Sequence, residues 1–392
     1  MNRRRGVAAV LAREWQRLLA DRFYWLFMIL LPLLSFAVLW AIFQQQVPRE
    51  LPIVVCDEDH SSLSRQMRRM IDASPSVRII PGNADFAEGQ RLVMERRAYA
   101  LIRIPSGTQR DVERGMTARI DCSYNAQFIL PGSLITRDLS QVLASLATGI
   151  DVRRRQGQGE PAAASLAHAE PIRIDRHILF NPHLNYITFL LTTLLPTMLQ
   201  IFILLTTVQA LGSELKERTV EAWLETAGLS PWRAVLGKLI PQMVVYLLVG
   251  LFMVLFLFRC LDVPVRGSIG MIVAGTFLFV LAVQAVGIFL VAAFANLRMA
   301  TSAASFYSGP AFAFTGVTFP SMAMPLLGRL WGEILPLTHY LRLLVGQAIR
   351  GASVQVSIPD CLALLLFAAV LPLVSMRRMG RVMRDSRFWG RS

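Results

Sequence analysis

The sequence predicts a membrane all-α bundle of six transmembrane helices per subunit with an inserted extracytoplasmic α/β domain. Three observations lead to this fold class. The chain has 392 residues, of which 54% are hydrophobic and only 17% are charged, whereas soluble domains carry about 25% charged residues. The mean hydropathy is +0.48, and several apolar runs approach or exceed the roughly 20 residues that cross hydrocarbon. One long polar stretch with alternating strand-like and helix-like segments follows the first apolar run.

The charge balance is strongly basic, with a formal net charge of +14. Such a charge can indicate nucleic-acid binding. Much of the arginine, however, flanks apolar runs, where cytoplasmic loops collect positive charge. The sequence contains neither a zinc-ligand array nor a basic recognition helix. We therefore expect membrane lipids, and no nucleic acid, as partners of the basic segments.

Residues 1–22 are expected to form a cytoplasmic amphipathic helix. Val7, Leu11, Trp15 and Leu18 recur at helical spacing, and the opposite face is basic, as in helices that lie in the headgroup layer. The residues of this interfacial helix that we single out are Arg13, Trp15 and Arg17.

Residues 23–43 form the first predicted span. A signal peptide is the alternative, because a basic region precedes an apolar one. The apolar run is too long for that, and bulky Trp40, Ile42 and Phe43 occupy the place of a small-residue cleavage site. The preceding arginines place the N-terminus in the cytoplasm.

Residues 44–181 are predicted to form an extracytoplasmic α/β domain, since strand-like and helix-like segments alternate along it. Strands are expected at 51–56, 77–80, 99–104 and 118–124. Helices are expected at 61–73, 85–96, 107–114 and 133–155, with a loop at 156–169. Cys56 and Cys122 lie in two of these strands, and an oxidising compartment permits a disulfide between them if the strands are adjacent.

Residues 182–376 are predicted to hold the second to sixth spans. These spans are expected at 184–211, 239–258, 269–294, 300–319 and 362–376. Residues 320–358 interrupt them with three prolines and a helix at 337–350, which we interpret as an outer re-entrant or interfacial region. Residues 377–392 form a basic tail. Six crossings place this tail in the cytoplasm with the N-terminus.

Motifs for catalysis are weak. Asp57 to His60 reads Asp-Glu-Asp-His, but these residues follow a strand and precede a helix, where acids serve as turn and cap residues. The alternative interpretation is a membrane hydrolase that uses Asp57, Asp59 and His60. No HExxH or GxSxG pattern occurs. The run ending in Gly237-Lys238 has Trp232 where a phosphate loop requires glycine. We expect neither an enzyme nor a bound cofactor or metal.

Polar residues within the spans are few. Gln200, Gln209 and Gln284 lie in apolar runs, where such side chains either form interhelical hydrogen bonds or line a pathway. Acidic and basic residues are absent from the middle of the predicted spans. This absence argues against a proton-coupled or ion-coupled pump, which usually carries intramembrane ionisable groups.

The charged insert at 213–238 lies between two apolar runs and is too polar to cross a bilayer. We expect Ser213 to cap a helix on which Glu217, Glu221 and Glu225 share one face, beside an exposed Trp223. Acids stacked in this way repel one another unless a partner supplies cations. This pattern favours a docking surface over a solvated turn. The predicted docking residues are Glu214, Lys216, Glu217, Arg218, Thr219, Glu221, Trp223 and Glu225.

The chain resembles, essentially end to end, the permease subunits of type-2 ABC exporters, in the group with a large external domain after the first span. The order and spacing of several short motifs carry this resemblance. They are Asn181-Pro182, the segment Glu214–Lys238, Ser308-Gly-Pro-Ala-Phe through Pro320, Met324-Pro325, Leu335 to Tyr340, and Arg350-Gly351.

The resemblance implies pairing with a cytoplasmic ABC ATPase, which would hold ATP and Mg, and with a second permease, identical or paralogous. Residues 213–238 would contain the coupling helix, and the N-terminal segment would be the connecting helix. The implied function is export of a hydrophobic or amphipathic substrate across the bacterial inner membrane, with or without a periplasmic adaptor. Ala222-Trp223-Leu224 departs from the more aliphatic run of the family, which leaves the partner ATPase open. The alternative is a membrane-anchored sensor or assembly scaffold whose external domain is a binding module.

Overall fold

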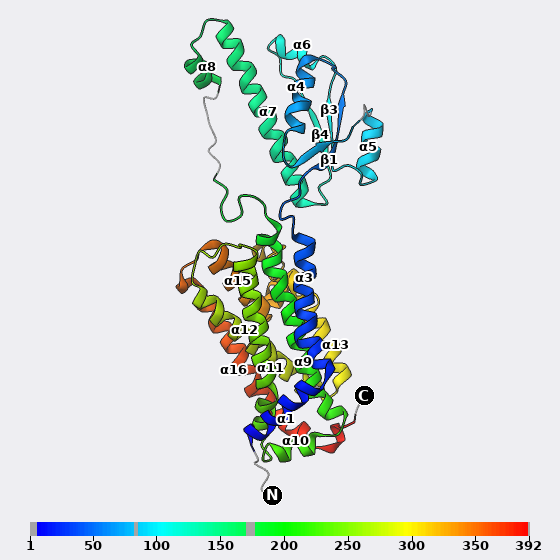
Figure 1. Ribbon diagram of the computed structural model, residues 1–392, viewed down its shortest axis with the longest axis vertical. Helices are drawn as coiled ribbons and strands as arrows, with labels where there is room; N and C mark the ends of the chain where they lie inside the picture. Colours follow the sequence, from blue (N-terminus) through cyan, green and yellow to red (C-terminus); the bar gives the residue numbers. More distant parts are fainter. Residues whose placement is uncertain (1–5, 82–84, 170–176, 391–392) are drawn as a thin grey trace. The chain divides into compact units, whose positions relative to one another are not determined.

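The computed structural model describes residues 6–81, 85–169 and 177–390. The chain divides into two compact units, a helical unit of Met1–Gln46 with Phe180–Ser392 and an α/β unit of Val47–Leu179 (Figure 1). Each unit is described by itself.

The α/β unit is built on a four-stranded sheet of order β2-β1-β3-β4. The central strand β1 (Leu51–Asp57) is almost entirely buried and apolar, as expected for a strand covered on both faces. It pairs in parallel with both neighbours, and β3 pairs antiparallel with β4. The other strands are β2 (Val77–Ile79), β3 (Ala100–Ile104) and β4 (Asp121–Tyr124).

The strands and helices that the sequence predicts in this unit are confirmed. The helices are α4 (Ser62–Asp72), α5 (Phe86–Met94), α6 (Thr108–Glu113) and α7 (Ile129–Gly157). A fifth helix, α8 (Ala162–Ala169), occupies the second half of the predicted loop at 156–169, so that prediction was wrong there. Three consecutive alanines begin this helix, and alanine has the highest intrinsic helix propensity.

The two cysteines of the α/β unit are free thiols. Cys56 on β1 lies opposite Arg103, and Cys122 on β4 lies opposite Ile102. Because β3 separates the two strands, their backbones are about 10 Å apart, beyond the Cα separation of about 7 Å that a disulfide can span. The disulfide that the sequence permits is therefore not formed.

The acidic segment after β1 serves as a turn. Asp57 accepts hydrogen bonds at Oδ1 from the backbone N–H of Asp59 (3.1 Å) and His60 (3.0 Å), and at Oδ2 from the hydroxyl of Ser64 (2.8 Å). Ser61 and Ser64 form a capping box that begins α4. Within the described part of the chain, no group of three or more acidic, histidine or cysteine side chains is placed to hold a metal ion. The geometry supports the interpretation of Asp57, Asp59 and His60 as turn and cap residues.

The helical unit begins with α1 (Val7–Ala20) and a continuous helix made of α2 (Arg22–Trp25), η1 (Leu26–Leu30) and α3 (Leu31–Phe43). It resumes with η2 (Ile187–Leu191), α9 (Thr192–Lys216), α10 (Val220–Thr226), α11 (Pro231–Leu255), η3 (Phe256–Cys260) and α12 (Ile269–Phe294). The remaining elements are α13 (Leu297–Ser308), η4 (Ala311–Phe314), η5 (Ser321–Ala323), α14 (Leu326–Glu333), α15 (Pro336–Val345), η6 (Gly346–Arg350), α16 (Val354–Arg384) and η7 (Ser386–Phe388).

Five helices in the described residues are long and apolar enough to cross a membrane: Arg22–Phe43, Ile187–Lys216, Pro231–Cys260, Ile269–Phe294 and Val354–Arg384. The sequence predicts six, and the predicted fifth span at 300–319 is not a span-length helix. There α13 has 12 residues, which is about 18 Å of helix. It ends before Gly309-Pro310, because proline supplies no backbone donor to continue the helix.

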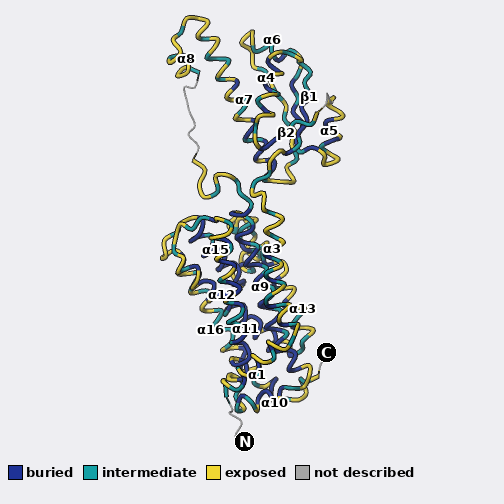
Figure 2. The backbone as a smooth tube through the Cα atoms, viewed as in Figure 1, coloured by how far each residue is buried: buried dark blue, intermediate teal, exposed yellow. Residues whose placement is uncertain are grey.

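Helix α9 is the centre of the helical unit. It packs against α3, α11, α12, α13 and α15, and most of its side chains are buried (Figure 2). Glycines on neighbouring helices permit close approach, as in other membrane bundles. A Cβ added at Gly287 would lie 2.5 Å from a methyl group of Thr207. The backbone of α12 therefore lies directly against this side chain of α9.

Helix α15 is buried on nearly all sides by α9, α12 and α16. The sequence predicts a re-entrant or interfacial helix here. Two of its polar side chains, His339 and Gln347, are buried, and each has polar partners. Gln347 donates to Ser357 Oγ (2.8 Å) and accepts from the backbone N–H of Ser268 (2.9 Å), and a His339 ring nitrogen lies 3.2 Å from Asp360 Oδ1.

The two ends of the helical unit meet at α10. Both α1 and α16 contact α10, and the backbone N–H of Gly390 donates to the carbonyl of Leu215 (2.8 Å). Figure 1 shows α1, α10 and the C-terminal end of the chain at the same end of the helical unit.

Candidate functional site: the connection between α9 and α11

Glu214 lies in the last turn of α9 with its side chain fully buried. Two effects oppose a charge at this position. A carboxylate at a helix C-terminus meets the negative end of the helix dipole, and burial removes it from water. A carboxylate in this position therefore requires several nearby cations or hydrogen-bond donors.

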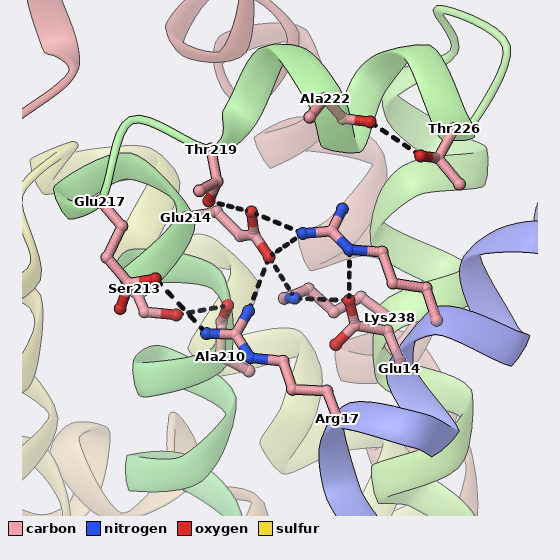
Figure 3. Close-up of polar contacts among 11 residues, drawn as sticks. Glu14, Arg17, Ala210, Ser213, Glu214, Glu217, Thr219, Ala222, Thr226 and Lys238 are labelled. Atoms are coloured by element: carbon pink, nitrogen blue, oxygen red, sulfur yellow. Dashed lines mark hydrogen bonds and ion pairs between the residues drawn. The ribbon is translucent and has the colours of Figure 1, made fainter. Parts of the chain in front are cut away.

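Three basic side chains from two other helices supply that compensation (Figure 3). Lys238 Nζ and Arg17 Nη1 each lie 2.8 Å from Glu214 Oε1. Arg13 Nη2 lies 3.0 Å from Oε1 and 3.2 Å from Oε2. The hydroxyl of Thr219 donates to Oε2. The carboxylate thus joins α1, the end of α9, the N-cap of α10 and the start of α11 at one point.

Lys238 is also fully buried, in the second turn of α11. Its Nζ atom lies 2.8 Å from Oε1 of Glu14, whose side chain is 3% exposed. The same Nζ atom lies 5.2 Å from the centre of the Trp223 ring, within the range of a cation–π contact. Glu14, Glu214, Lys238, Arg13 and Arg17 form one group of two acids and three bases, which we name the buried ion cluster.

The backbone of α1 approaches α11 closely beside this cluster. A Cβ at Gly237 would lie 2.7 Å from Cβ of Val10, so only glycine fits there without a shift. Gly237-Lys238 therefore serves helix packing and ion pairing. The buried face of α1 consists of Val10, Glu14 and Leu18. Of the predicted apolar stripe, Leu18 belongs to this buried face, Val7 and Leu11 are half-buried, and Trp15 is 38% exposed.

Helix α10 has one buried and one exposed face. Its buried residues are Val220, Trp223 and Leu224, whereas Glu221 and Glu225 are exposed at helical i, i+4 spacing. The prediction of an exposed Trp223 was wrong, because this side chain packs over Lys238. Two further details differ from the prediction. Ser213 lies inside α9 rather than at a helix cap, and Glu217 precedes α10 instead of sharing its acidic face.

The predicted docking residues thus divide into those that pack inside the bundle and those that are exposed. Glu214 and Trp223 are buried, Thr219 is half-buried, and the others are exposed. The exposed members are Lys216, Glu217, Arg218, Glu221 and Glu225. Arg17 connects the groups, since its Nη2 atom lies 3.6 Å from Glu217 Oε2.

The glutamines of the spans have different surroundings from one another. Gln284 Nε2 donates weakly to the carbonyl of Leu239 on the neighbouring α11 (3.4 Å), which is an interhelical contact. Gln200 is fully buried, and its amide atoms have no hydrogen-bond partner in the part of the chain that the structure describes. Gln209 is half-buried.

Sequence reasoning missed Glu14 and Lys238 as members of the site. One signal was available for Glu14. It lies four residues from both Val10 and Leu18, on the apolar side of an otherwise basic amphipathic helix. An acid on the apolar side of such a helix requires a buried cation.

Comparison with known proteins shows the family to which the chain belongs. A family model described as ABC-2 family transporter protein matches residues 22–377, so the chain belongs to this family of membrane transport permeases. The chain is also similar to the inner membrane transport permease YhhJ of Escherichia coli (strain K12). The two are 23% identical over 333 residues, which cover 83% of this chain and 84% of that protein. The YhhJ permease of Shigella flexneri matches with the same identity and coverage.

Proposed function

We propose that the chain is the membrane-spanning permease subunit of an ATP-driven exporter, in which a separate cytoplasmic ATPase acts on α10. ABC-2 permeases normally work with an ATPase subunit, which supports this assignment. One observation on α10 supports its role as the docking helix. A short helix with an exposed acidic face has its opposite face fixed to the ends of α1, α9 and α11.

This arrangement suits the transmission of force. Val220, Trp223 and Leu224 fix α10 to the bundle, and the buried ion cluster joins the helices on which α10 rests. Buried ion pairs are costly to separate. A displacement of α10 is therefore expected to move the three helix ends together rather than to break their contacts.

The exposed face of α10 indicates the chemistry of the partner. Glu221 and Glu225 lie four residues apart on one helix, and like charges at that spacing destabilise it slightly. Basic side chains on the ATPase would relieve this repulsion. ATP and Mg would be bound by the ATPase, and this chain would bind neither.

The placement in the membrane follows from the positive-inside rule. Arginines are concentrated before the first span and after Met376, so these segments and α10 would be cytoplasmic. The five span-length helices of the described residues would by themselves place the two ends on opposite sides, so the broken segment between α12 and α16 would provide the remaining crossing. The α/β unit would then be periplasmic in a bacterial inner membrane, where an adaptor can bind it. The full transporter would contain a second permease, identical or paralogous, and would export a hydrophobic or amphipathic substrate.

The docking proposal is tested by reversing charge on α10. In Glu221→Lys/Glu225→Lys, the acidic face becomes basic while the buried ion cluster is unchanged. We expect the stimulation of the co-purified ATPase to fall at least about tenfold, in line with the loss of charged interface contacts. Glu88→Lys/Glu95→Lys on and next to α5 is the matched control, since both acids are exposed. Full binding and stimulation by the α10 variant would show that the partner docks elsewhere.

A sensor or scaffold is the second candidate, and one cavity of the α/β unit favours it. This cavity has a volume of about 400 Å³ and is lined by Met67, Leu143, Leu146 and Ile150, with Asp151 and Arg154 at its polar side. A scaffold would retain its full function in Glu221→Lys/Glu225→Lys, whereas an exporter would lose transport. The same variant therefore distinguishes the two candidates.

A further inference from the structure

A second cavity lies in the helical unit, away from the buried ion cluster. It has a volume of about 610 Å³, within the range of small-molecule sites. The start of the α9 helix, the segment around Gly316, η6 and the start of α16 surround it. The proposed ATPase docking mechanism uses none of the residues that line this cavity.

One part of the cavity wall is apolar. Phe189, Val317, Leu341, Val345 and Ile349 contribute to it. Leu341 and Ile349 are themselves buried parts of the protein core, so the wall is a fixed surface. Phe189 remains 41% exposed. A bound apolar group would remove these surfaces from water, at about 25 cal/mol for each Å² of apolar area.

The charged part of the wall holds two arginines, which differ in their partners. Arg342 Nη1 lies 3.1 Å from Glu333 Oε2, in a two-pronged ion pair. Arg350 Nη2 donates to the carbonyl of Arg342 (3.4 Å). In the described ranges of the chain, no carboxylate lies within ion-pair distance of Arg350. The Asp360 carboxylate in the same wall is paired with His339. Among the described residues that line this cavity, Arg350 is thus a cation without a carboxylate partner.

The backbone that carries Arg350 is held in place. Arg350 ends the π-turn η6, and Gly351 follows with a φ of 65°, a left-handed conformation that favours glycine. Gln347 in the same turn is fixed by Ser268 and Ser357. A Cβ at Gly346 would lie 3.6 Å from Arg350 Nη2, so the guanidinium rests close to the turn. A fixed cation beside an apolar wall is preorganised for a ligand.

We propose that this cavity binds an anionic amphiphile, with its phosphate or carboxylate on Arg350 and its hydrocarbon part against Phe189, Val345 and Ile349. Guanidinium groups bind such oxyanions through paired N–H donors. Of the nearby carboxylates, Glu333 is paired with Arg342, and Asp360 lies 3.2 Å from a His339 ring nitrogen. The ligand could come from the bilayer as a lipid or from the transport pathway as a substrate. The site itself does not depend on the ATPase proposal.

Binding is tested with the full-length chain in a nonionic maltoside detergent and dodecyl phosphate as the probe. We expect saturable binding of dodecyl phosphate and much weaker binding of dodecylphosphocholine, whose headgroup has no net charge. Arg350→Gln should weaken dodecyl phosphate binding about tenfold or more, as expected for the loss of a hydrogen bond between charged groups. Arg259→Gln, another exposed arginine in the helical unit, is the matched control and should bind normally.

A second variant tests the apolar wall. Val356 lines the cavity and is 65% exposed, so Val356→Trp should fold normally and obstruct the hydrocarbon part. We expect it to weaken dodecyl phosphate binding several-fold. Equal binding of dodecyl phosphate by the native chain and Arg350→Gln, with the native melting temperature retained, would overturn the proposal. Equal binding of dodecyl phosphate and dodecylphosphocholine by the native chain would also overturn it.

Two further arms distinguish the sources of the ligand. In nanodiscs of phosphatidylglycerol and phosphatidylcholine, native mass spectrometry should show phosphatidylglycerol retained by the native chain and lost in Arg350→Gln if the occupant is a lipid. If the occupant is a substrate, the complex with its ATPase should release bound dodecyl phosphate on ATP addition. Either result supports the site. Glu221→Lys/Glu225→Lys should leave dodecyl phosphate binding unchanged, so failure of one proposal does not imply failure of the other.

Discussion

Two charged groups of the helical unit differ in how their charges are compensated. In the buried ion cluster, Glu214 and Lys238 are fully buried, and each contacts at least two groups of opposite charge. Beside the 610 Å³ cavity, Arg350 is exposed and lacks a carboxylate partner in the described ranges. The comparison indicates that the first group stabilises the fold, whereas the second is available to a ligand.

The physical reason lies in the cost of desolvation. A buried charge whose partner is removed costs several kcal/mol, because water cannot replace the partner. A charge at the wall of an open cavity remains hydrated until a ligand arrives and displaces that water. The two groups should therefore respond in opposite ways to substitution, one in stability and the other in binding.

The largest expected effect is on stability, from Lys238→Met. The substitution keeps much of the side-chain volume but removes the cation between Glu14 and Glu214. Glu14 then loses its close cation, and Glu214 keeps only Arg13 and Arg17 as ion-pair partners. We expect a loss of about 3–5 kcal/mol in the free energy of unfolding. Denaturant unfolding in mixed micelles measures this change. Glu14→Gln added to Lys238→Met should restore part of the loss, because the buried carboxylate that has lost its close cation is then neutral.

Two single variants serve as controls. Lys216→Met removes an exposed lysine at the end of the same α9 helix, and it should change the unfolding free energy by less than about 0.5 kcal/mol. Arg350→Gln should be equally mild, because its guanidinium has no carboxylate to leave unpaired. A loss from Arg350→Gln as large as that from Lys238→Met would remove the distinction between the two groups.

The sequence predictions were correct where neighbouring residues determine the structure, and they failed where residues distant in the sequence determine it. Alternating short apolar and amphipathic segments specified the α/β unit, and its predicted strands and helices were confirmed. The surroundings of Trp223 could not be predicted in the same way. Trp223 is buried because Lys238 and α1 pack around α10, and the ion pair between Arg13 and Glu214 joins residues 201 positions apart. A local pattern shows only that the segment 213–238 is polar.

The broken span is an intermediate case. The local signal of Gly309-Pro310 was visible in the sequence, and it correctly marks the end of α13. The apolar composition around it nevertheless favoured a continuous span, since hydropathy measures length and polarity and carries no information on backbone donors. Composition therefore predicted the membrane class of the protein, but it did not predict that the fifth expected span lacks a continuous helix of span length.

The second prediction concerns the close approach beside the buried ion cluster. Gly237→Ala places a methyl group 2.7 Å from Cβ of Val10, and we expect a loss of about 2–3 kcal/mol from overpacking. Val10→Ala in the same chain should recover part of this loss by removing the methyl groups in contact. The control is Gly270→Ala, whose added Cβ would meet only Ser268 Oγ at 3.6 Å. Equal melting temperatures for Gly237→Ala and the native chain would mean that α1 can move away from α11 at no cost.

The third prediction concerns the support of Arg350. Gln347→Leu removes the acceptor of the Ser268 backbone N–H and the donor to Ser357, with an expected cost of about 1–2 kcal/mol for the unpaired groups. Because η6 then loses its fixed position, dodecyl phosphate binding should weaken as well. Gln355→Leu, at an exposed position of α16, should change neither quantity. A large change in stability with unchanged dodecyl phosphate binding would show that Arg350 is positioned by other contacts.

The smallest effect is the pH dependence of the ion pair beside the cavity. The hydrogen bond from Arg342, aided by the attraction of its positive charge, holds the pKa of Glu333 below its ordinary value, which is about 4.3. A lowered pKa in the folded state means that the pair stabilises the fold above the unfolded pKa and loses this contribution as pH falls through the folded pKa. Since Glu333 is about half exposed, solvent screening limits the contribution to less than about 1 kcal/mol. The difference in unfolding free energy between the native chain and Glu333→Gln should therefore be constant from pH 7 to 5 and shrink toward pH 3. A difference that stays constant to pH 3 would mean that Glu333 and Arg342 do not interact in solution, and Arg342 would then be a second uncompensated cation of the cavity.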